Sequence, residues 1–403
     1  MTPPSPAPAA PSTESPRALR GRQPDLARRA LVVSAAWAGA LPGAWAAGPG
    51  VAPGSVLIGQ SIALQGGRNP YGAEVLAGIQ ALFSRVNAAG GVHRRQLVLR
   101  TLDDDNKAER AEANARALVK DNVFLLFGSI EGGPSTAVMK AADELAVPFF
   151  GPMAGSPTLR RPHQRLVFPV RAEHRDEFRR LVGYGSSIGL GRVAFLHADT
   201  EVGRQHLDNL RRACSDAGVA VAAALPLAGE VSDAQLDGFV VQLREARADM
   251  LLNHGMSSVY ERLIRRVRAA GLRITLLGVN SGSTQLAAAL GPLAEGMVFA
   301  QVVPSPWSRK TAIAREYQDA FTQVHRGRAL SYGSMEGYLT AKALVLALTQ
   351  AGPDPSRDGF VRALEAAPPM DLGGVTLTYR PGDHAGSSFV DLAIVSRDGQ
   401  FLQ

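Results

Sequence analysis

The chain of 403 residues is 46% hydrophobic and 20% charged, a globular balance with enough length for two domains and a large core. Residues 1–46 hold five Arg against two acids, so they contribute +3 of the net charge of +7, and about +4 is spread over the remainder. No Lys/Arg run has the density or the interleaved aromatic residues of a nucleic-acid site, which excludes a nucleic-acid partner.

The N-terminal segment has the pattern of a secretion signal. An Arg pair at 28–29 precedes the 12-residue apolar run "ALVVSAAWAGAL", and "AWA" at 44–46 fits the small-x-small rule for cleavage. We expect residues 1–46 to be a signal peptide; an ordinary N-terminal helix is the alternative, and the Arg pair leaves Sec and twin-arginine export open. The run is too short to cross a bilayer, and no cysteine stands near the cleavage site. The predicted location is therefore the periplasm, without a lipid anchor.

From Ser55 onward, short apolar strands alternate with amphipathic helices. The helix expected at 71–89 has apolar residues at helical spacing, and the Gly pair at 90–91 ends it. The expected strands are 56–63, 96–105, 123–129, 147–152, 193–199, 219–227, 249–255, 274–279, 297–303, 374–380 and 388–395. The expected helices are 71–89, 107–121, 134–146, 203–217, 233–247, 257–270, 309–325, 334–350 and 356–366.

This alternation predicts an α/β fold in which parallel sheets are covered by helices on both faces. About five strand–helix units precede Arg171 and four or five follow it, too many for one sheet. We therefore expect two doubly wound lobes. The carboxyl ends of parallel strands meet at one edge of each sheet, where ligands bind in open α/β folds.

The loop after the first strand, "IALQGGRNP" (62–70), is the first candidate site. The glycines around it lack the G-x-G-x-x-G spacing of a dinucleotide site, and the chain has no G-x-x-x-x-G-K-[ST] phosphate loop. Long loops at this edge bind ligands more often than they simply connect elements, although a surface connection is the alternative. Two later loops, 128–134 and 151–157, also follow strands and leave backbone N–H groups open to a carboxylate. Together the three loops predict one shared pocket.

The sequence offers little for catalysis. It contains no H-E-x-x-H, and its single cysteine, Cys214, excludes an internal disulfide and cysteine-ligated metal sites. The three acids at 103–105 end a strand, where neighbours point to opposite faces and do not converge on an ion. His197 and His254 also end strands, and we interpret them as ligand contacts or packing residues. We expect no enzyme activity, no cofactor and no metal.

From Ser55 onward the chain resembles the leucine/isoleucine/valine-binding family, the type I periplasmic solute-binding proteins of ABC transporters. The resemblance rests on the order and spacing of "IGQSIALQGGRNPYGAEVLAGIQ", "VNAAGGVHRRQLVLRTLDD", "GSIEGGPST", "VPFFGPMAGSPTLR", "RVAFLHADTEVGRQHLDNL" and "AEGMVFAQ". It implies a monomer of two lobes, 55–171 plus 298–385 and 172–297 plus 386–403. A three-crossing hinge joins the lobes, which close on a solute and present it to a membrane permease.

The resemblance also implies ligand-binding positions, residue by residue. Tyr71 matches a Tyr at the start of the first helix, whereas Gly155 stands where the family has a hydroxyl-bearing residue. In the second lobe the family places a Tyr at Val202 and another near Met256. The complete set of predicted ligand-binding residues is Gln65, Tyr71, Glu131, Gly132, Gly133, Ala154, Gly155, Ser156, Asp199, Val202, His254, Met256 and Asn280.

Asn280 falls where the amino-acid binders of the family place the acid that neutralises the ammonium of the ligand. A buried ammonium without a carboxylate is costly. Glu131 and Asp199 are the candidates to replace that acid. The departure favours a carboxylate without an amine, or an amide, over a branched-chain amino acid, with Arg68 as a candidate contact for the anion.

The sequence thus favours an exported receptor that binds a small amino-acid-like, carboxylate or amide ligand and feeds an ABC transporter. A periplasmic sensor that passes ligand occupancy to a signalling partner is the second hypothesis. An enzyme on a doubly wound sheet is the third, and the absence of a cofactor fingerprint and of a nucleophile–base pair argues against it.

Overall fold

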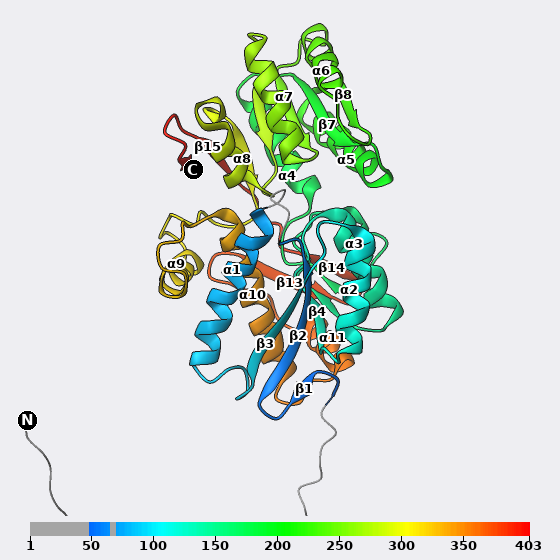
Figure 1. Ribbon diagram of the computed structural model, residues 1–403, viewed down its shortest axis with the longest axis vertical. Helices are drawn as coiled ribbons and strands as arrows, with labels where there is room; N and C mark the ends of the chain where they lie inside the picture. The colour runs from blue at the N-terminus through cyan, green and yellow to red at the C-terminus, as the bar shows by residue number, and fades with distance from the viewer. Residues whose placement is uncertain (1–47, 65–69) are drawn as a thin grey trace, which may run out of the picture. The chain divides into compact units, whose positions relative to one another are not determined.

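The computed structural model describes residues 48–64 and 70–403, and it has the expected α/β architecture (Figure 1). The predicted signal peptide and the loop residues Gln65 and Arg68 lie outside the described residues. The strands are β1 (Val51–Ala52), β2 (Ser55–Ile62), β3 (Gln96–Asp103), β4 (Leu125–Phe127), β5 (Phe149–Phe150), β6 (Val167–Phe168), β7 (Arg192–Ala198), β8 (Ala220–Leu227), β9 (Met250–His254), β10 (Thr275–Gly278), β11 (Val298–Gln301), β12 (Met370–Asp371), β13 (Thr376–Arg380), β14 (Asp383–Gly386), β15 (Asp391–Val395) and β16 (Phe401–Leu402).

The helices fill most of the connections between these strands. They are α1 (Pro70–Ala88), α2 (Ala108–Lys120), α3 (Gly132–Glu144), α4 (His174–Ser187), α5 (Glu201–Ala217), α6 (Asp233–Glu245), α7 (Ser257–Ala269), α8 (Ser283–Leu290), α9 (Ala312–Val324), α10 (Tyr332–Ala351) and α11 (Arg357–Ala366), with short 3₁₀ helices η1 (Pro157–Leu159) and η2 (Gly291–Ala294). Within the described ranges, no helix combines the length and the apolar character that crossing a membrane requires.

The first sheet has the strand order β3-β2-β4-β5-β6, in which every pair is parallel, and β1 pairs antiparallel with the start of β2. One core packs α1, α9, α10 and α11 against this sheet, and a second core packs α2 and α3 against it. Figure 1 shows α1 and α10 on one side of β2 and β4, with α2 and α3 on the other. All three residues of β4 are buried, as expected for a strand covered on both faces.

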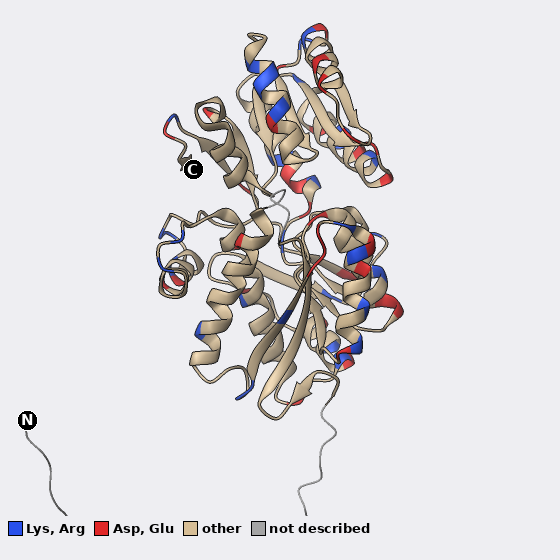
Figure 2. Cartoon of the chain, in the orientation of Figure 1, with Lys and Arg blue, Asp and Glu red and all other residues tan. Residues whose placement is uncertain are grey.

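The second sheet has the order β16-β15-β11-β10-β9-β7-β8. Strands β7 to β11 are parallel, whereas β15 pairs antiparallel with β11 and β16 pairs antiparallel with β15. Helices α4 and α5 pack in one core against this sheet, and α6, α7 and α8 pack in another. Figure 2 shows charges of both signs spread over the helices, in keeping with the absence of a basic stripe in the sequence.

The chain passes between the two sheets three times: after β6, after β11 and after β14. The second passage corrects one predicted boundary, because β11 pairs with β10 and β15 and so belongs to the second sheet. The chain therefore leaves that sheet after Gln301, and not before residue 298. The first and third passages lie together, since Ser387 N donates to Val170 O at 3.0 Å. The hinge motion that the resemblance implies remains a prediction.

Several elements were not expected from the sequence. Helix α4 was missed because its 14 residues include only a few apolar positions, among them Phe178, Leu181 and Val182, which are buried against the second sheet. The small antiparallel sheet β12-β13-β14 was anticipated only at its central strand. Its buried residues join the first core, so this C-terminal segment completes the first sheet's packing.

Candidate ligand site

Tyr71 is the second residue of α1 and follows the loop at the carboxyl end of β2. Its side chain is 2% exposed, and its hydroxyl donates a hydrogen bond to Glu336 Oε2 on α10. Glu336 is itself 1% exposed. The predicted ligand residue Tyr71 is therefore held against a buried carboxylate that the sequence analysis did not select.

Asn280 reaches the same carboxylate from the second sheet. It follows β10 and is fully buried, and its Nδ2 donates to Glu336 Oε2. The Nδ2 atom also lies 3.5 Å from the Tyr71 hydroxyl oxygen. Two residues that the sequence analysis placed in one site therefore meet in the structure, and Glu336 joins them.

Arg171 extends this cluster into the first passage between the sheets. Its buried guanidinium donates to Glu177 Oε1, and Nη1 lies 3.6 Å from Glu336 Oε1 and 3.3 Å from Ser281 Oγ. Asn280 N donates to Glu177 Oε2 at 2.9 Å, which closes a ring of interactions. We call Tyr71, Arg171, Glu177, Asn280 and Glu336 the buried polar network.

Burial sets the protonation of the network. Burial raises the pKa of both Glu336 and Glu177, while the positive charge of Arg171 opposes that rise. Burial lowers the pKa of Arg171, but the two carboxylates outweigh it and raise that pKa above its ordinary value. Burial, reinforced by the negative charge of Glu336, raises the pKa of Tyr71 well above its usual value. Tyr71 therefore remains a protonated hydrogen-bond donor at neutral pH.

Two oxygens of the network have no hydrogen-bond donor among the described residues. They are Glu336 Oε1 and Asn280 Oδ1, and both are buried. A buried acceptor without a donor is costly, so native proteins rarely retain one without a functional reason. Both oxygens suit an N–H or O–H donor of a small molecule.

The predicted loops 131–133 and 154–156 lie against each other. A Cβ placed on Gly132 would lie 3.7 Å from Ser156 Cβ. The Ser156 and Thr136 hydroxyls both contact the Thr158 hydroxyl, at 2.9 and 2.8 Å. Glu131, at the start of α3, has φ +63° and adds to the raised pKa of Tyr71. This side of the site therefore offers hydroxyls and the N-terminal end of a helix, which suit an anion.

Gly155 has a steric explanation. His174 N donates to Gly155 O at 3.0 Å, and a Cβ on Gly155 would lie 2.7 Å from the His174 ring. A hydroxyl-bearing residue does not fit at this position unless His174 moves. Arg160 fixes the same loop, because its guanidinium donates to the carbonyls of Ala154, Ser156 and Arg171 at 3.3, 3.3 and 2.9 Å. Burial lowers the pKa of Arg160 to about 10.

Other predicted residues do not join the network. Asp199 is exposed and forms an ion pair with Arg204 at 3.3 Å, so nothing places it near Asn280 as a replacement acid. Met256 is 56% exposed at the start of α7, and Gly133 is exposed on α3. Val202 is partly buried on α5.

The two histidines that end strands have different surroundings. His197 is buried, and its Nδ1 lies 2.9 Å from Ala198 O. His254 is partly buried, and its ring lies within 4.3 Å of that of His174, measured between centroids. His174 Nδ1 contacts Glu177 Oε1 at 2.8 Å, so His254 borders the network through His174.

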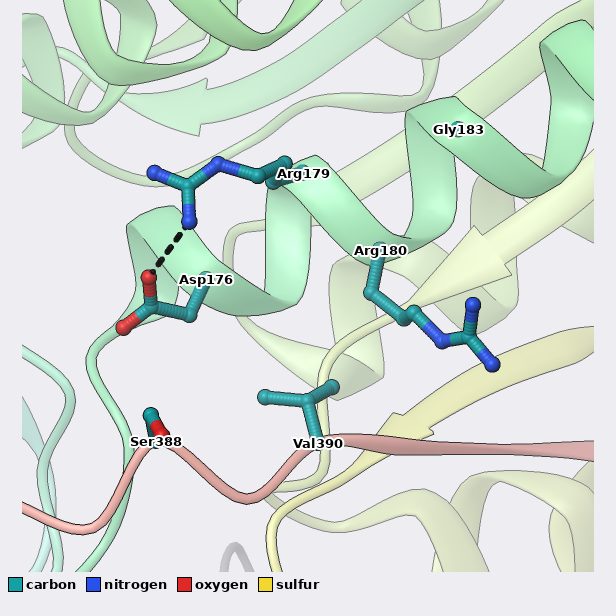
Figure 3. Close-up of a pocket in the computed structure, with 6 residues that line it drawn as sticks. All are labelled: Asp176, Arg179, Arg180, Gly183, Ser388 and Val390. Atoms are coloured by element: carbon teal, nitrogen blue, oxygen red, sulfur yellow. Dashed lines mark hydrogen bonds and ion pairs between the residues drawn. The ribbon is translucent and has the colours of Figure 1, made fainter.

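A surface hollow of about 390 Å³ lies apart from the network (Figure 3). Its lining comes from α4 and the third passage between the sheets: Asp176, Arg179, Arg180, Gly183, Ser388 and Val390. An ion pair of 3.1 Å between Asp176 and Arg179 borders it. None of the predicted ligand residues that the structure describes lines this hollow, so we do not assign the ligand site to it.

The comparisons with known proteins agree with the fold. Residues 55–400 match the family described as "Periplasmic binding protein". The chain belongs to this family. The chain is similar to the Leu/Ile/Val-binding protein homolog 3 of Brucella melitensis biotype 1, with 22% identity over 340 residues, or 83% of this chain and 90% of the relative. Homolog 2 of Brucella abortus (strain 2308) is 23% identical over 292 residues, or 71% of this chain and 77% of the relative.

Solved structures of periplasmic binding proteins share the whole architecture. A possible leucine/isoleucine/valine-binding protein from Rhodopirellula baltica SH 1 matches with a TM-score of 0.79 at 26% identity, covering 87% of this chain and 96% of that chain. A fatty acid ABC transporter substrate-binding protein from Thermomonospora curvata matches with a TM-score of 0.77 at 20% identity, covering 88% and 92%. The second likeness shows the fold alone.

The sequence analysis missed Arg171, Glu177 and Glu336 as members of the site. Glu336 carried a usable signal, because it is the one acidic residue in the largely apolar 20-residue helix α10. An isolated acid in such a helix is rarely buried without a partner. Arg171 and Glu177 carried no such signal, since they lie in the charged segment "RAEHRDEF", which looks like a solvated helix start.

Proposed function

We propose that this periplasmic binding protein is an exported receptor that binds a small organic solute at the buried polar network and delivers it to an ABC transporter permease. The observation that carries the proposal is the meeting of Tyr71, from the first sheet's edge, with Asn280, from the second, at Glu336. A solute that contacts both lobes biases them toward a closed arrangement, which is the signal a permease reads. Family membership supports solute binding without chemistry.

The network favours a solute that carries N–H donors, either an amino-acid-like molecule or an amide. Glu336 Oε1 and Asn280 Oδ1 are the acceptors for those donors. Glu336 also supplies a carboxylate near the position where Asn280 replaces the expected acid, which removes the main reason to prefer a ligand without an amine. The hydroxyls of Ser156, Thr158 and Thr136 and the start of α3 suit a carboxylate or carbonyl at the other end of the solute.

A thermal-shift screen tests the proposal. The panel contains amino acids, short amides, and aliphatic and aromatic carboxylates that lack nitrogen. A solute at one hundred times its dissociation constant adds about 2.7 kcal/mol to the free energy of unfolding, which raises the melting temperature measurably. We expect stabilisation by members that carry N–H donors. Stabilisation confined to nitrogen-free carboxylates would contradict the proposed ligand class, and a flat response would favour the sensor hypothesis over transport.

A further inference from the structure

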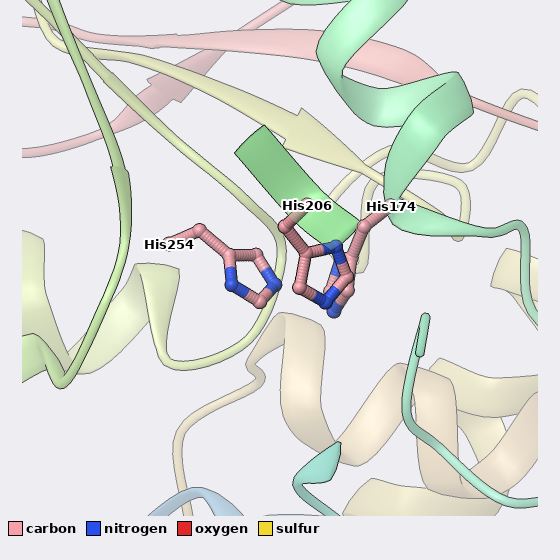
Figure 4. A group of neighbouring side chains, drawn as sticks. All are labelled: His174, His206 and His254. Carbon is pink, nitrogen blue, oxygen red and sulfur yellow. The ribbon is translucent and has the colours of Figure 1, made fainter. Parts of the chain in front are cut away.

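Three histidines from separate elements converge beside the buried polar network. His174 begins α4, His206 lies within α5, and His254 ends β9. Each offers one ring nitrogen, and these three nitrogens lie within 4.8 Å of one another. Figure 4 shows the three imidazole rings beside one another. We call these residues the histidine cluster.

The spacing of the cluster is close to that of a metal site. Zinc binds imidazole nitrogen at about 2.0–2.1 Å, which places tetrahedral ligands roughly 3.3 Å apart. The three candidate nitrogens lie within 4.8 Å of one another, so the widest pair must close by about 1.5 Å to reach that spacing. We expect rotation of the side chains to close this gap when an ion binds.

The hydrogen bonding of the cluster also fits a metal. His206 is 1% exposed, and its Nδ1 has no hydrogen-bond partner among the described residues, an arrangement that is costly in a buried side chain. His174 Nδ1 contacts Glu177 Oε1 at 2.8 Å, which leaves Nε2 of His174 available. A carboxylate on the far nitrogen of a histidine is the usual partner of a metal ligand, because it fixes the ring orientation.

The surroundings keep the imidazoles in the neutral form that binds metals. Burial lowers the pKa of all three histidines, and nearby Arg171 lowers those of His174 and His254 further. Arg171 opposes a second cation, but Glu177 and Glu336 contact its guanidinium and offset its charge. His254 is the partly exposed member, so an ion and a fourth ligand enter from its side.

We propose that His174, His206 and His254 bind one divalent transition-metal ion of the class that prefers imidazole, such as Zn²⁺, Co²⁺ or Ni²⁺. The sequence analysis expected no metal, because the histidines are far apart in the chain and match no metal motif. The bound ion would tie α4, which follows the first passage between the sheets, to α5 and β9. His174 N also bonds to Gly155 O, so the ion would fix the start of α4 beside the predicted ligand loop.

The test uses the full chain, purified without a polyhistidine tag, freed of metal with a chelator and then titrated with Zn²⁺ and Co²⁺. We expect one ion per chain by calorimetry, a rise in melting temperature with Zn²⁺, and a visible Co²⁺ spectrum typical of nitrogen ligands in a four-coordinate site. His206→Asn and His254→Asn should each weaken Zn²⁺ binding by about 100-fold or more. His197→Asn removes a buried histidine of the same sheet outside the cluster, and it should leave Zn²⁺ affinity unchanged.

Three results would overturn the proposal. The first is a wild-type protein that binds no stoichiometric Zn²⁺, and the second is an octahedral, water-like Co²⁺ spectrum. The third is equal Zn²⁺ affinity in His197→Asn, His206→Asn and His254→Asn, which would assign binding to surface histidines. Circular dichroism establishes that each variant is folded. The Co²⁺ spectrum of the wild type decides the question even if a cluster variant fails to fold.

Discussion

Tyr71 and Asn280 are 209 positions apart, yet the Asn280 side-chain nitrogen lies 3.5 Å from the Tyr71 hydroxyl oxygen. Both side chains donate to the same oxygen of Glu336. Tyr71 follows a strand of the first sheet and Asn280 follows a strand of the second. Their convergence on one buried carboxylate is therefore the point at which a bound solute would sense both halves of the protein.

Tyr71→Phe removes one donor to the Glu336 carboxylate. A hydrogen bond to a charged group contributes about 1.5–3 kcal/mol, so we expect a loss of that size in the free energy of unfolding measured with urea. The matched control is Tyr379→Phe, because that buried hydroxyl donates to a neutral acceptor, Pro169 O, at 2.8 Å. It should cost about 0.5–1.5 kcal/mol. Equal losses in the two variants would argue that Glu336 is not charged in the folded protein.

Arg171→Met leaves Glu177 and Glu336 buried without their cation. Breaking a buried ion pair by removing one partner costs about 3–5 kcal/mol, and we expect that loss at pH 7. The variant should recover stability as the pH is lowered, because protonation removes the unpaired negative charges. Arg116, which pairs with Glu112 and Glu144 on the surface, provides the control, and Arg116→Met should behave like the wild type. An unchanged urea midpoint in Arg171→Met would contradict the role given to the network.

Gly155→Ala places a methyl group against the ring and backbone of His174, at 2.7 Å. Overpacking of this kind costs about 1–3 kcal/mol, and we expect the same variant to bind solute less tightly because the loop must shift. Gly133→Ala is the control, since a Cβ there has no neighbour within 4 Å. Alanine in a helix is about 1 kcal/mol more favourable than glycine, so Gly133→Ala should be neutral or slightly stabilising. A neutral Gly155→Ala would show that the loop is looser than described.

The histidine cluster predicts how stability depends on pH in metal-free protein. Burial depresses the pKa of His174, His206 and His254 below the unfolded value of about 6.5. The unfolded chain therefore takes up protons first, and the free energy of unfolding falls as the pH drops below about 6.5. Each pKa unit of depression corresponds to about 1.4 kcal/mol.

Two buried carboxyls work in the opposite direction. Burial raises the pKa of Glu177 and Glu336 in the folded protein. Their contribution to the free energy of unfolding is therefore fully present below the unfolded-state pKa of about 4.3, and it is lost as the pH rises through the folded-state pKa. Comparison of wild type with His206→Leu isolates the histidine contribution, since the carboxyls are common to both. In urea titrations between pH 5 and 7, the free energy of unfolding should change less steeply with pH in His206→Leu than in the wild type. Superimposable pH profiles would rule out a buried neutral His206.

Much of the fold follows from local pattern. The helix expected at 71–89 is α1 at Pro70–Ala88, and the strand expected at 56–63 is β2 at Ser55–Ile62. The helix has apolar residues at helical spacing between Pro70 and Gly90, and the strand is a short apolar run that follows Pro53 and Gly54, so local sequence decides both. Tertiary packing decides whether α4 forms and to which sheet β11 belongs. The periodicity of the sequence does not show which sheet a segment packs against.

The site was predictable only in part. Tyr71 and Asn280 both follow strands, and the resemblance to the solute-binding family placed them in one site. Asp199 also follows a strand, but it is exposed, because the position of a residue in a strand does not determine its burial. The network needs Arg171, Glu177 and Glu336 from three distant segments, and only the packed structure reveals that their charges compensate one another.

Titration calorimetry on the best solute from the thermal-shift panel tests the central claim most directly. The proteins compared are the wild type, Asn280→Ala, Glu336→Gln and the surface control Arg116→Met. We predict that an amino acid or amide binds the wild type and the control with one site per chain. Asn280→Ala and Glu336→Gln each lose a hydrogen bond to a charged or buried group. This loss should weaken solute binding by about tenfold to 100-fold. Equal affinity for all four proteins would contradict the claim that the solute binds at the buried polar network.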